Sequence, residues 1–290
     1  MISHLVRMAG ITIFILLCVF YPFFPGQYDS LAMPLSITAQ VGVAIGLLLL
    51  VPIGILWLIY ELRKQTQRKQ NLAVNPKRYY FAYVSTFLFS IIAIAVSLVA
   101  FATVGFSLVI ISVIVWVFIF SRLLPNLKSM KDVEHDNFCP APIYFMFVPI
   151  TAVLFQLFFG AAITNHSRDY AIANSREYIS DIEDYHAQYG NYPSSLLAIW
   201  KDYYPNVVGI EKFHYTPSDN AYNLFFEQPR LFFDNIGTRE WVMYNPLDEH
   251  QMFSHTSWFL LLPPNELERA QGWYAIHDII HPHWKYFWFD

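Results

Sequence analysis

Long apolar segments separated by short polar ones fill the first 163 residues of this 290-residue chain. A transmembrane helix needs about 17 to 25 mostly apolar residues to cross a hydrocarbon core roughly 30 Å thick. One uncharged stretch, residues 81–120, would make a helix about 60 Å long, so we expect it to turn back at Thr103-Val104-Gly105. The pattern predicts a transmembrane domain over residues 1–163, an α-helical bundle of five helices at about 8–24, 35–59, 81–101, 106–120 and 142–163.

The basic residues predict how these helices are oriented. Loops rich in Lys and Arg stay in the cytoplasm, and the loop at 25–33 contains Asp29 but no cation. A signal peptide over residues 1–25 is the less favoured alternative, because the apolar run is long and no Ala-x-Ala site follows it. We therefore expect a cytoplasmic N-terminus and an external C-terminal half. The two cytoplasmic loops contain Arg63, Lys64, Arg68, Lys69, Lys77 and Arg78, and Arg122, Lys128 and Lys131.

The residues after 163 change in both charge and period. Residues 1–163 hold 10 Lys and Arg against 5 Asp and Glu, whereas residues 164–290 hold 8 against 17. This acidic half lacks the clustered cations that nucleic-acid phosphates need, which excludes a nucleic-acid binder. An apolar stripe at helical spacing continues from 161 to 189 without Gly or Pro, so we expect the fifth span to leave the membrane as one long helix.

A turn and a short second helix should follow that long helix. Gly190 suits the left-handed position just after a helix, and Pro193 with Ser194 suits the start of another. We expect the apolar side chains of the short helix to face inward, namely Leu196, Leu197, Ile199 and Trp200.

Beyond residue 205 the apolar period becomes two, which is typical of strands. Antiparallel strands rich in aromatic residues would pack on the helix stripe, giving an α+β layered domain over residues 164–290. The expected strands are 212–216, 222–227, 231–234, 240–244, 253–262, 273–277 and 284–289.

The segment YHAQYGNYPSSL, residues 185–196, with FHYTPSDNAYNLFF and WVMYNP after it, resembles the globular domain of type II secretion pseudopilins and type IV pilins. The resemblance covers roughly residues 145–246. It implies a long helix packed on an antiparallel sheet, in a bacterial envelope. The chain has four expected spans upstream and lacks the processing site and helix glutamate of a prepilin, so the resemblance implies a fixed pilin-like domain rather than a pilus subunit.

The last residues concentrate candidate metal ligands. His277, Asp278, His281 and His283 offer imidazole and carboxylate groups of the kind that bind Zn or another transition metal. Pro282 prevents one regular helix from carrying all of them, so histidines that form hydrogen bonds at a strand edge are the alternative. The tail is also rich in aromatic residues, which would partly complete the core and partly form a partner or headgroup surface.

Other chemistry has little support in the sequence. The sequence contains no nucleotide-binding glycine motif and no G-x-S-x-G elbow. Ser254 and His255 are next to each other in the sequence, and the cysteines Cys18 and Cys139 lie in or beside apolar segments. The carboxylates Glu183 and Asp184 are expected to be solvated surface charges. The chain is thus expected to be non-enzymatic and to need no cofactor.

The spans themselves contain no Asp, Glu, Lys, Arg or His, which argues against a proton-coupled transporter. Gly42 and Gly46 form a GxxxG pattern that lets another helix approach closely, and packing within the same chain is favoured over a dimer contact. Together these patterns predict an inner-membrane protein whose periplasmic domain is an interaction or scaffold module. Its partner would be an envelope protein or a second copy, and the alternative is a metal-binding sensor or metalloenzyme.

Overall fold

The computed structural model describes residues 2–70, 78–104, 106–132, 137–218, 220–234, 238–250, 252–254, 258–260 and 274–289. The chain forms two compact units. The first unit holds residues 1–19 and 34–160, and the second holds residues 20–33 together with 161–290. The short segment 20–33 therefore belongs with the C-terminal half, which the sequence pattern did not predict.

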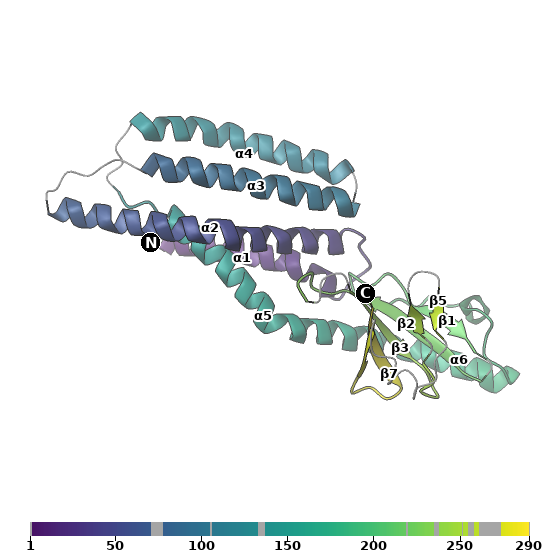
Figure 1. Ribbon diagram of the computed structural model, residues 1–290. Coiled ribbons are helices and arrows are strands. Elements are labelled where there is room, and N and C mark those ends of the chain that lie inside the picture. The colour runs from purple at the N-terminus through teal and green to yellow at the C-terminus, as the bar shows by residue number, and fades with distance from the viewer. Residues whose placement is uncertain are drawn as a thin grey trace. The chain divides into compact units, whose positions relative to one another are not determined.

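The first unit is built from long apolar helices (Figure 1). They are α1 (Ile2–Phe20), α2 (Ala32–Lys69), α3 (Arg78–Val104), α4 (Phe106–Asp132) and the first part of α5 (Ala141–Asn174). Among the described residues, four helical stretches are long and apolar enough to cross a membrane: Ile2–Phe23, Ala32–Lys69, Arg78–Val104 and Ala141–Tyr189. The most apolar part of α4 is shorter, Val113–Pro125. These helices indicate a membrane protein.

The helix ends differ from the expected span ends. Helix α2 continues to Lys69, so much of the basic segment that was expected to be a loop is helical. The expected turn after the third span lies between α3, which ends at Val104, and α4, which begins at Phe106; Gly105 itself is outside the described residues.

Glycines of α2 lie where neighbouring helices come close. A Cβ atom on Gly42 would lie 3.3 Å from Cγ2 of Val96 in α3, and one on Gly46 would lie 3.8 Å from Cβ of Pro149 in α5. Both glycines therefore face helices of their own chain. The tightest approach is at Gly54, where a Cβ would lie 2.9 Å from Cγ of Met146, and the GxxxG pattern did not single out this position.

In the second unit, helix α5 is followed almost directly by a further helix, α6, which ends at Gly190. Only Ser175 separates α5 from α6 (Arg176–Tyr189), and the Ser175 N–H still bonds the carbonyl oxygens of Ala171 and Ile172 at 3.2 Å. Gly190 ends α6 in the left-handed region, at φ +78°, and its N–H donates to the carbonyl of His186 at 2.8 Å. The helix end is the one that the sequence predicted.

A five-stranded antiparallel sheet packs against this helix, in the order β1-β2-β3-β7-β6 (Figure 1). Its strands are β1 (His214–Pro217), β2 (Tyr222–Gln228), β3 (Arg239–Tyr244), β7 (Trp284–Phe289) and β6 (Tyr274–Asp278). A separate hairpin pairs β4 (Met252–Ser254) with β5 (Trp258–Leu260), where one strand over 253–262 was expected. Residues 231–234, also expected as a strand, form a turn in which the N–H of Asp234 bonds the carbonyl of Leu231.

The core of the second unit lies between the sheet and the helix stripe. Leu224, Phe226 and Val242 are fully buried on the strands, and they pack with Tyr178 and Ile182 of α6. Burying each such side chain contributes about 1.5 to 3 kcal/mol. Trp284 and Phe287 of the aromatic tail are also buried, so part of the tail completes the domain as expected.

Residues 20–33 are bound to the second unit by backbone hydrogen bonds. The N–H of Gly26 donates to the carbonyl of Asn206 at 2.8 Å, that of Asp29 to Val208 at 2.9 Å, and that of Gly209 to Pro22 at 2.7 Å. An isolated β-bridge joins residues 25 and 207. No local sequence pattern encodes this pairing, because its two halves lie about 180 residues apart.

Candidate functional site

The second unit contains a cavity of about 650 Å³ between the turn after α6 and strand β1. Its floor is aromatic: Tyr178 stacks on Tyr203 with ring centroids 4.3 Å apart and meets Phe213 edge-on at 5.9 Å. Tyr178 and Phe213 are buried. A cavity of this size with an aromatic floor is typical of binding sites. The lining residues are Tyr178, Ser194, Ser195, Leu196, Leu197, Trp200, Lys201, Asp202, Tyr203, Tyr204, Lys212, Phe213 and Tyr215.

Two large apolar side chains at the rim of this cavity point into solvent. Leu197 is 82% exposed and Trp200 is 93% exposed. Leu197 lies in η2 (Leu196–Ile199) and Trp200 follows it. This element is a 3₁₀ helix, which has three residues per turn. Leu196 and Ile199 therefore share the inner face and pack on the core, whereas Leu197 and Trp200 share the outer face. The expectation that all four face inward is wrong for the outer pair.

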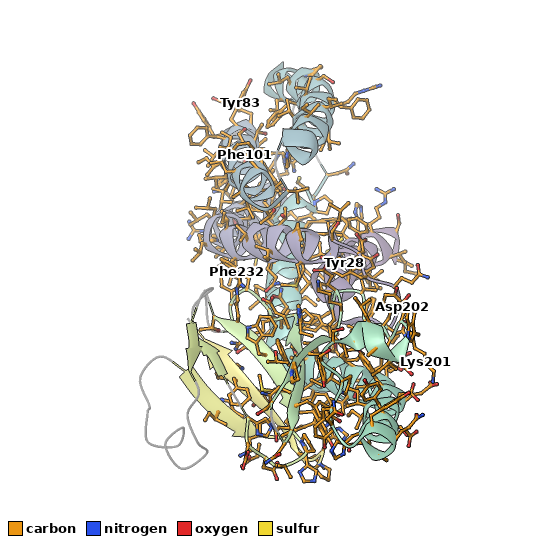
Figure 2. The ribbon with its side chains drawn as sticks, turned by 90° about the vertical axis from the view of Figure 1, so that its right-hand side faces the viewer. Tyr28, Tyr83, Phe101, Lys201, Asp202 and Phe232 are labelled. Carbon is orange, nitrogen blue, oxygen red and sulfur yellow. The ribbon has the colours of Figure 1, made fainter. Side chains whose placement is uncertain are left out.

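Polar groups surround the same cavity. Lys201 Nζ lies 2.5 Å from Oδ2 of Asp181 in α6, and Figure 2 shows Lys201 and Asp202 at the surface of the unit. The Tyr215 hydroxyl donates to the carbonyl of Pro193 at 2.8 Å. The short helix that was expected to begin at Pro193 begins at Leu196. The Tyr203 hydroxyl is buried and has no hydrogen-bond partner among the described residues.

The four expected metal ligands have separate partners. His281 Nε2 lies 3.0 Å from Asp169 Oδ1, and His283 Nδ1 lies 3.1 Å from Asp248 Oδ2. Asp278 is exposed and lies 3.6 Å from Lys285, while the ring of His277 stacks on Tyr286 at 4.6 Å. No group of three or more His, Cys, Asp or Glu within the described part of the chain is placed to hold a metal ion. The geometry thus gives the metal hypothesis no support.

Another histidine, His250, serves a structural role. Its side chain is almost fully buried, and its ring nitrogens lie 3.2 Å from the carbonyl oxygens of Asp248 and His283. Burial lowers the pKa of His250 below its ordinary value, so the ring is neutral near pH 7 and donates to one of these carbonyls. His255, the other upstream histidine, lies outside the described residues.

A buried charge cluster, Arg168, Arg230 and Glu240, ties α5 to the sheet. Glu240 Oε1 accepts hydrogen bonds from Arg168 Nε at 3.0 Å and Nη2 at 2.5 Å, and its Oε2 accepts from Trp288 Nε1 at 2.8 Å. Arg230 Nε lies 3.8 Å from the same carboxylate. The guanidinium groups of Arg168 and Arg230 lie 4.1 Å and 4.2 Å from the ring centroids of Tyr286 and Trp288. The sequence showed no sign of this cluster, because Arg168 lies 72 positions before Glu240 in the chain.

The first unit also buries an ion pair that the sequence did not indicate. Arg78 Nε and Nη2 each donate to one carboxylate oxygen of Glu61 at 2.7 Å, and Arg78 also donates to the carbonyl of Asn137 at 2.6 Å. Trp57 Nε1 donates to Glu61 at 3.2 Å. Both carboxylate oxygens of Glu61 and two guanidinium nitrogens of Arg78 are bonded, so the pair joins α2, α3 and the segment before α5 as a structural contact.

The carboxylate Glu183 is likewise engaged within the unit. Its oxygens accept hydrogen bonds from the hydroxyls of Tyr222 at 3.0 Å and Tyr192 at 3.4 Å. Burial raises the pKa of Tyr222 above its ordinary value, so that hydroxyl remains a donor. Glu183 is thus half-buried and accepts hydrogen bonds within the unit, whereas Asp184 is exposed, as expected of a solvated charge.

Comparison with known proteins identified no relative of this chain. No family model, no curated protein and no solved structure matches the chain.

Proposed function

We propose that this chain is a non-enzymatic, five-span bacterial inner-membrane protein whose pilin-like C-terminal domain lies in the periplasm and serves as an interaction or scaffold module. The observation that carries the proposal is the solvent-facing pair Leu197 and Trp200 beside an aromatic cavity. Large exposed apolar side chains next to a cavity mark a contact surface. The partner is an envelope protein or a second copy of the chain, and the pilin resemblance favours the machinery of secretion or pili.

The pairing of residues 20–33 with the second unit supports five crossings rather than four. The loop after α1 and the domain after α5 pair by backbone hydrogen bonds, which supports a topology with both on one side of the membrane. In that topology the chain crosses an even number of times between them. Helices α2, α3 and α5 supply three crossings, and α4 supplies the fourth. The side without basic loops is the periplasm by the positive-inside rule.

We expect a cysteine at Asn137 to be reachable only from the cytoplasm. The test uses Asn137→Cys in a background with Cys18→Ser and Cys139→Ser, labelled with a membrane-impermeant maleimide in intact spheroplasts. Five crossings place Asn137 inside, so it labels only after permeabilisation, whereas the matched variant Tyr28→Cys, whose site is 47% exposed, labels at once. Labelling of both variants in intact spheroplasts would mean that α4 does not cross.

The double variant Leu197→Ser/Trp200→Ser should lose its partner while keeping its fold. Both side chains are exposed, so the free energy of unfolding should change by less than about 0.5 kcal/mol. Co-purification from detergent extracts, quantified by mass spectrometry, should fall at least about fivefold for the specific partners.

Two controls bracket that experiment. Ile280→Ser changes another apolar side chain, 98% exposed and outside the cavity lining, and should retain the partners. Deletion of residues 164–290 should remove the same partners as the double variant. If the deletion leaves the set of co-purified partners unchanged, the proposed function is wrong.

A further inference from the structure

The cavity beside η2 opens onto the edge of the sheet at β1. In the described part of the chain β1 is the first strand of the sheet and pairs only with β2. Phe213 and Tyr215, one before β1 and one within it, line the cavity, as does Lys212. An edge strand presents backbone N–H and C=O groups that an extended segment can pair with. The cavity and the edge thus form one continuous surface.

The charges on this surface differ from those of the rest of the unit. Residues 164–290 carry an excess of acidic groups, yet two cations, Lys201 and Lys212, line the cavity against one carboxylate, Asp202. Lys201 is already paired with Asp181. Lys212 is exposed and has no ion pair with another described residue, so it is the cation available to an incoming carboxylate.

We propose that this surface binds an extended segment of a partner protein, which adds a strand to β1. One apolar side chain of that segment enters the aromatic cavity, and an acidic side chain two positions away, on the same face of the added strand, meets Lys212. Leu197 and Trp200 cover the segment from the rim. The inference rests on the proposed function and specifies the chemistry of the partner.

The geometry favours a protein segment over a small molecule. A small molecule inside the cavity would leave Leu197 and Trp200 in water, whereas an extended segment along the edge would cover them.

The test pans a phage library of random twelve-residue peptides against the full-length protein in lipid nanodiscs, with empty nanodiscs as background. The dissociation constants of the enriched peptides are then measured by fluorescence polarisation. We expect the enriched sequences to share an acidic residue two positions from a large apolar one. Their affinity should fall about fivefold with Lys212→Glu, and Lys212→Arg should keep it within about twofold. Lys285→Glu, the same charge reversal on β7, is the matched control and should also keep it within about twofold.

A second probe tests the strand pairing itself. N-methylation of alternate amides in an enriched peptide removes one row of donors and keeps the side chains, and one of the two registers should weaken binding about tenfold. The proposal is overturned if no sequence is enriched, if the enriched peptides are basic, if Lys212→Glu and Lys285→Glu act equally, or if neither methylated register matters. Self-association that requires the cavity would identify a second copy as the occupant and would also overturn it. The co-purification experiment tests the proposed function separately. If partners depend on the C-terminal domain but no peptide binds the surface, the proposed function stands and only this inference is wrong.

Discussion

Replacing Glu240 with glutamine is expected to lower the free energy of unfolding of the second unit by about 3 to 5 kcal/mol. Glu240 is 1% exposed and is the carboxylate that Arg168, Arg230 and Trp288 share. Neutralising it leaves two guanidinium groups, each 6% exposed, without their buried counter-charge. A cation in a medium of low dielectric that has lost its partner costs far more than the pair itself contributes.

Tryptophan fluorescence during heating of the full-length protein in detergent measures this effect, and the midpoint should fall by about 10 °C. Glu227→Gln is the matched control. Its carboxylate lies 3.7 Å from Arg239, in a pair whose side chains are 48% and 59% exposed, so its loss should cost less than about 1 kcal/mol. Equal shifts for the two variants would show that the Glu240 cluster is not a buried structural contact.

The second large effect is expected for Gly209→Ala, which should release residues 20–33 from the second unit. A Cβ at this position would lie 2.6 Å from the carbonyl oxygen of Pro22 and 2.8 Å from its Cβ, and backbone cannot move aside as a flexible side chain can. Overpacking of this kind costs about 1 to 3 kcal/mol, and here it acts directly on the hydrogen bond between Gly209 and Pro22.

Hydrogen exchange followed by mass spectrometry reports the release. The amides of Gly26, Asp29 and Val208 are bonded across this contact, so peptides covering 22–29 and 206–210 should exchange at least about tenfold faster. Gly10→Ala is the control, because a Cβ on Gly10 meets nothing within 4 Å and the residue lies in α1. Unchanged exchange in the Gly209 variant would mean that the segment tolerates the clash.

Local patterns predicted some elements well. Alternation of apolar and polar residues located the strands at 222–228, 239–244 and 284–289, and Gly190 marked a helix end because its left-handed conformation is a local property. The helical period explains why one prediction about the short helix was wrong. Leu197 and Trp200 were assigned inward on the α-helical period, but η2 has three residues per turn, which separates them from Leu196 and Ile199.

Other parts of the structure depend on a local turn or on contacts between distant residues. The apolar segment 231–234 reads as a strand, yet it follows Pro229 and turns back on itself. The candidate ligands His277, Asp278, His281 and His283 are close in sequence, but His281 pairs with Asp169 and His283 with Asp248, so they do not converge within the described part of the chain. The Arg168–Glu240 contact joins residues 72 positions apart, and no local sequence pattern in either segment predicts it.

The attachment of residues 20–33 to residues 206–209 also has a consequence for biosynthesis. The early segment leaves the ribosome more than 170 residues before its partner, a delay on the order of ten seconds or more at roughly 5 to 20 residues per second. During that time Phe23, which is 2% exposed in the finished unit, has no core to enter. The second unit can close over it only after residues 206–209 have been made, so a folded second unit marks a chain whose apolar helices have all been synthesised.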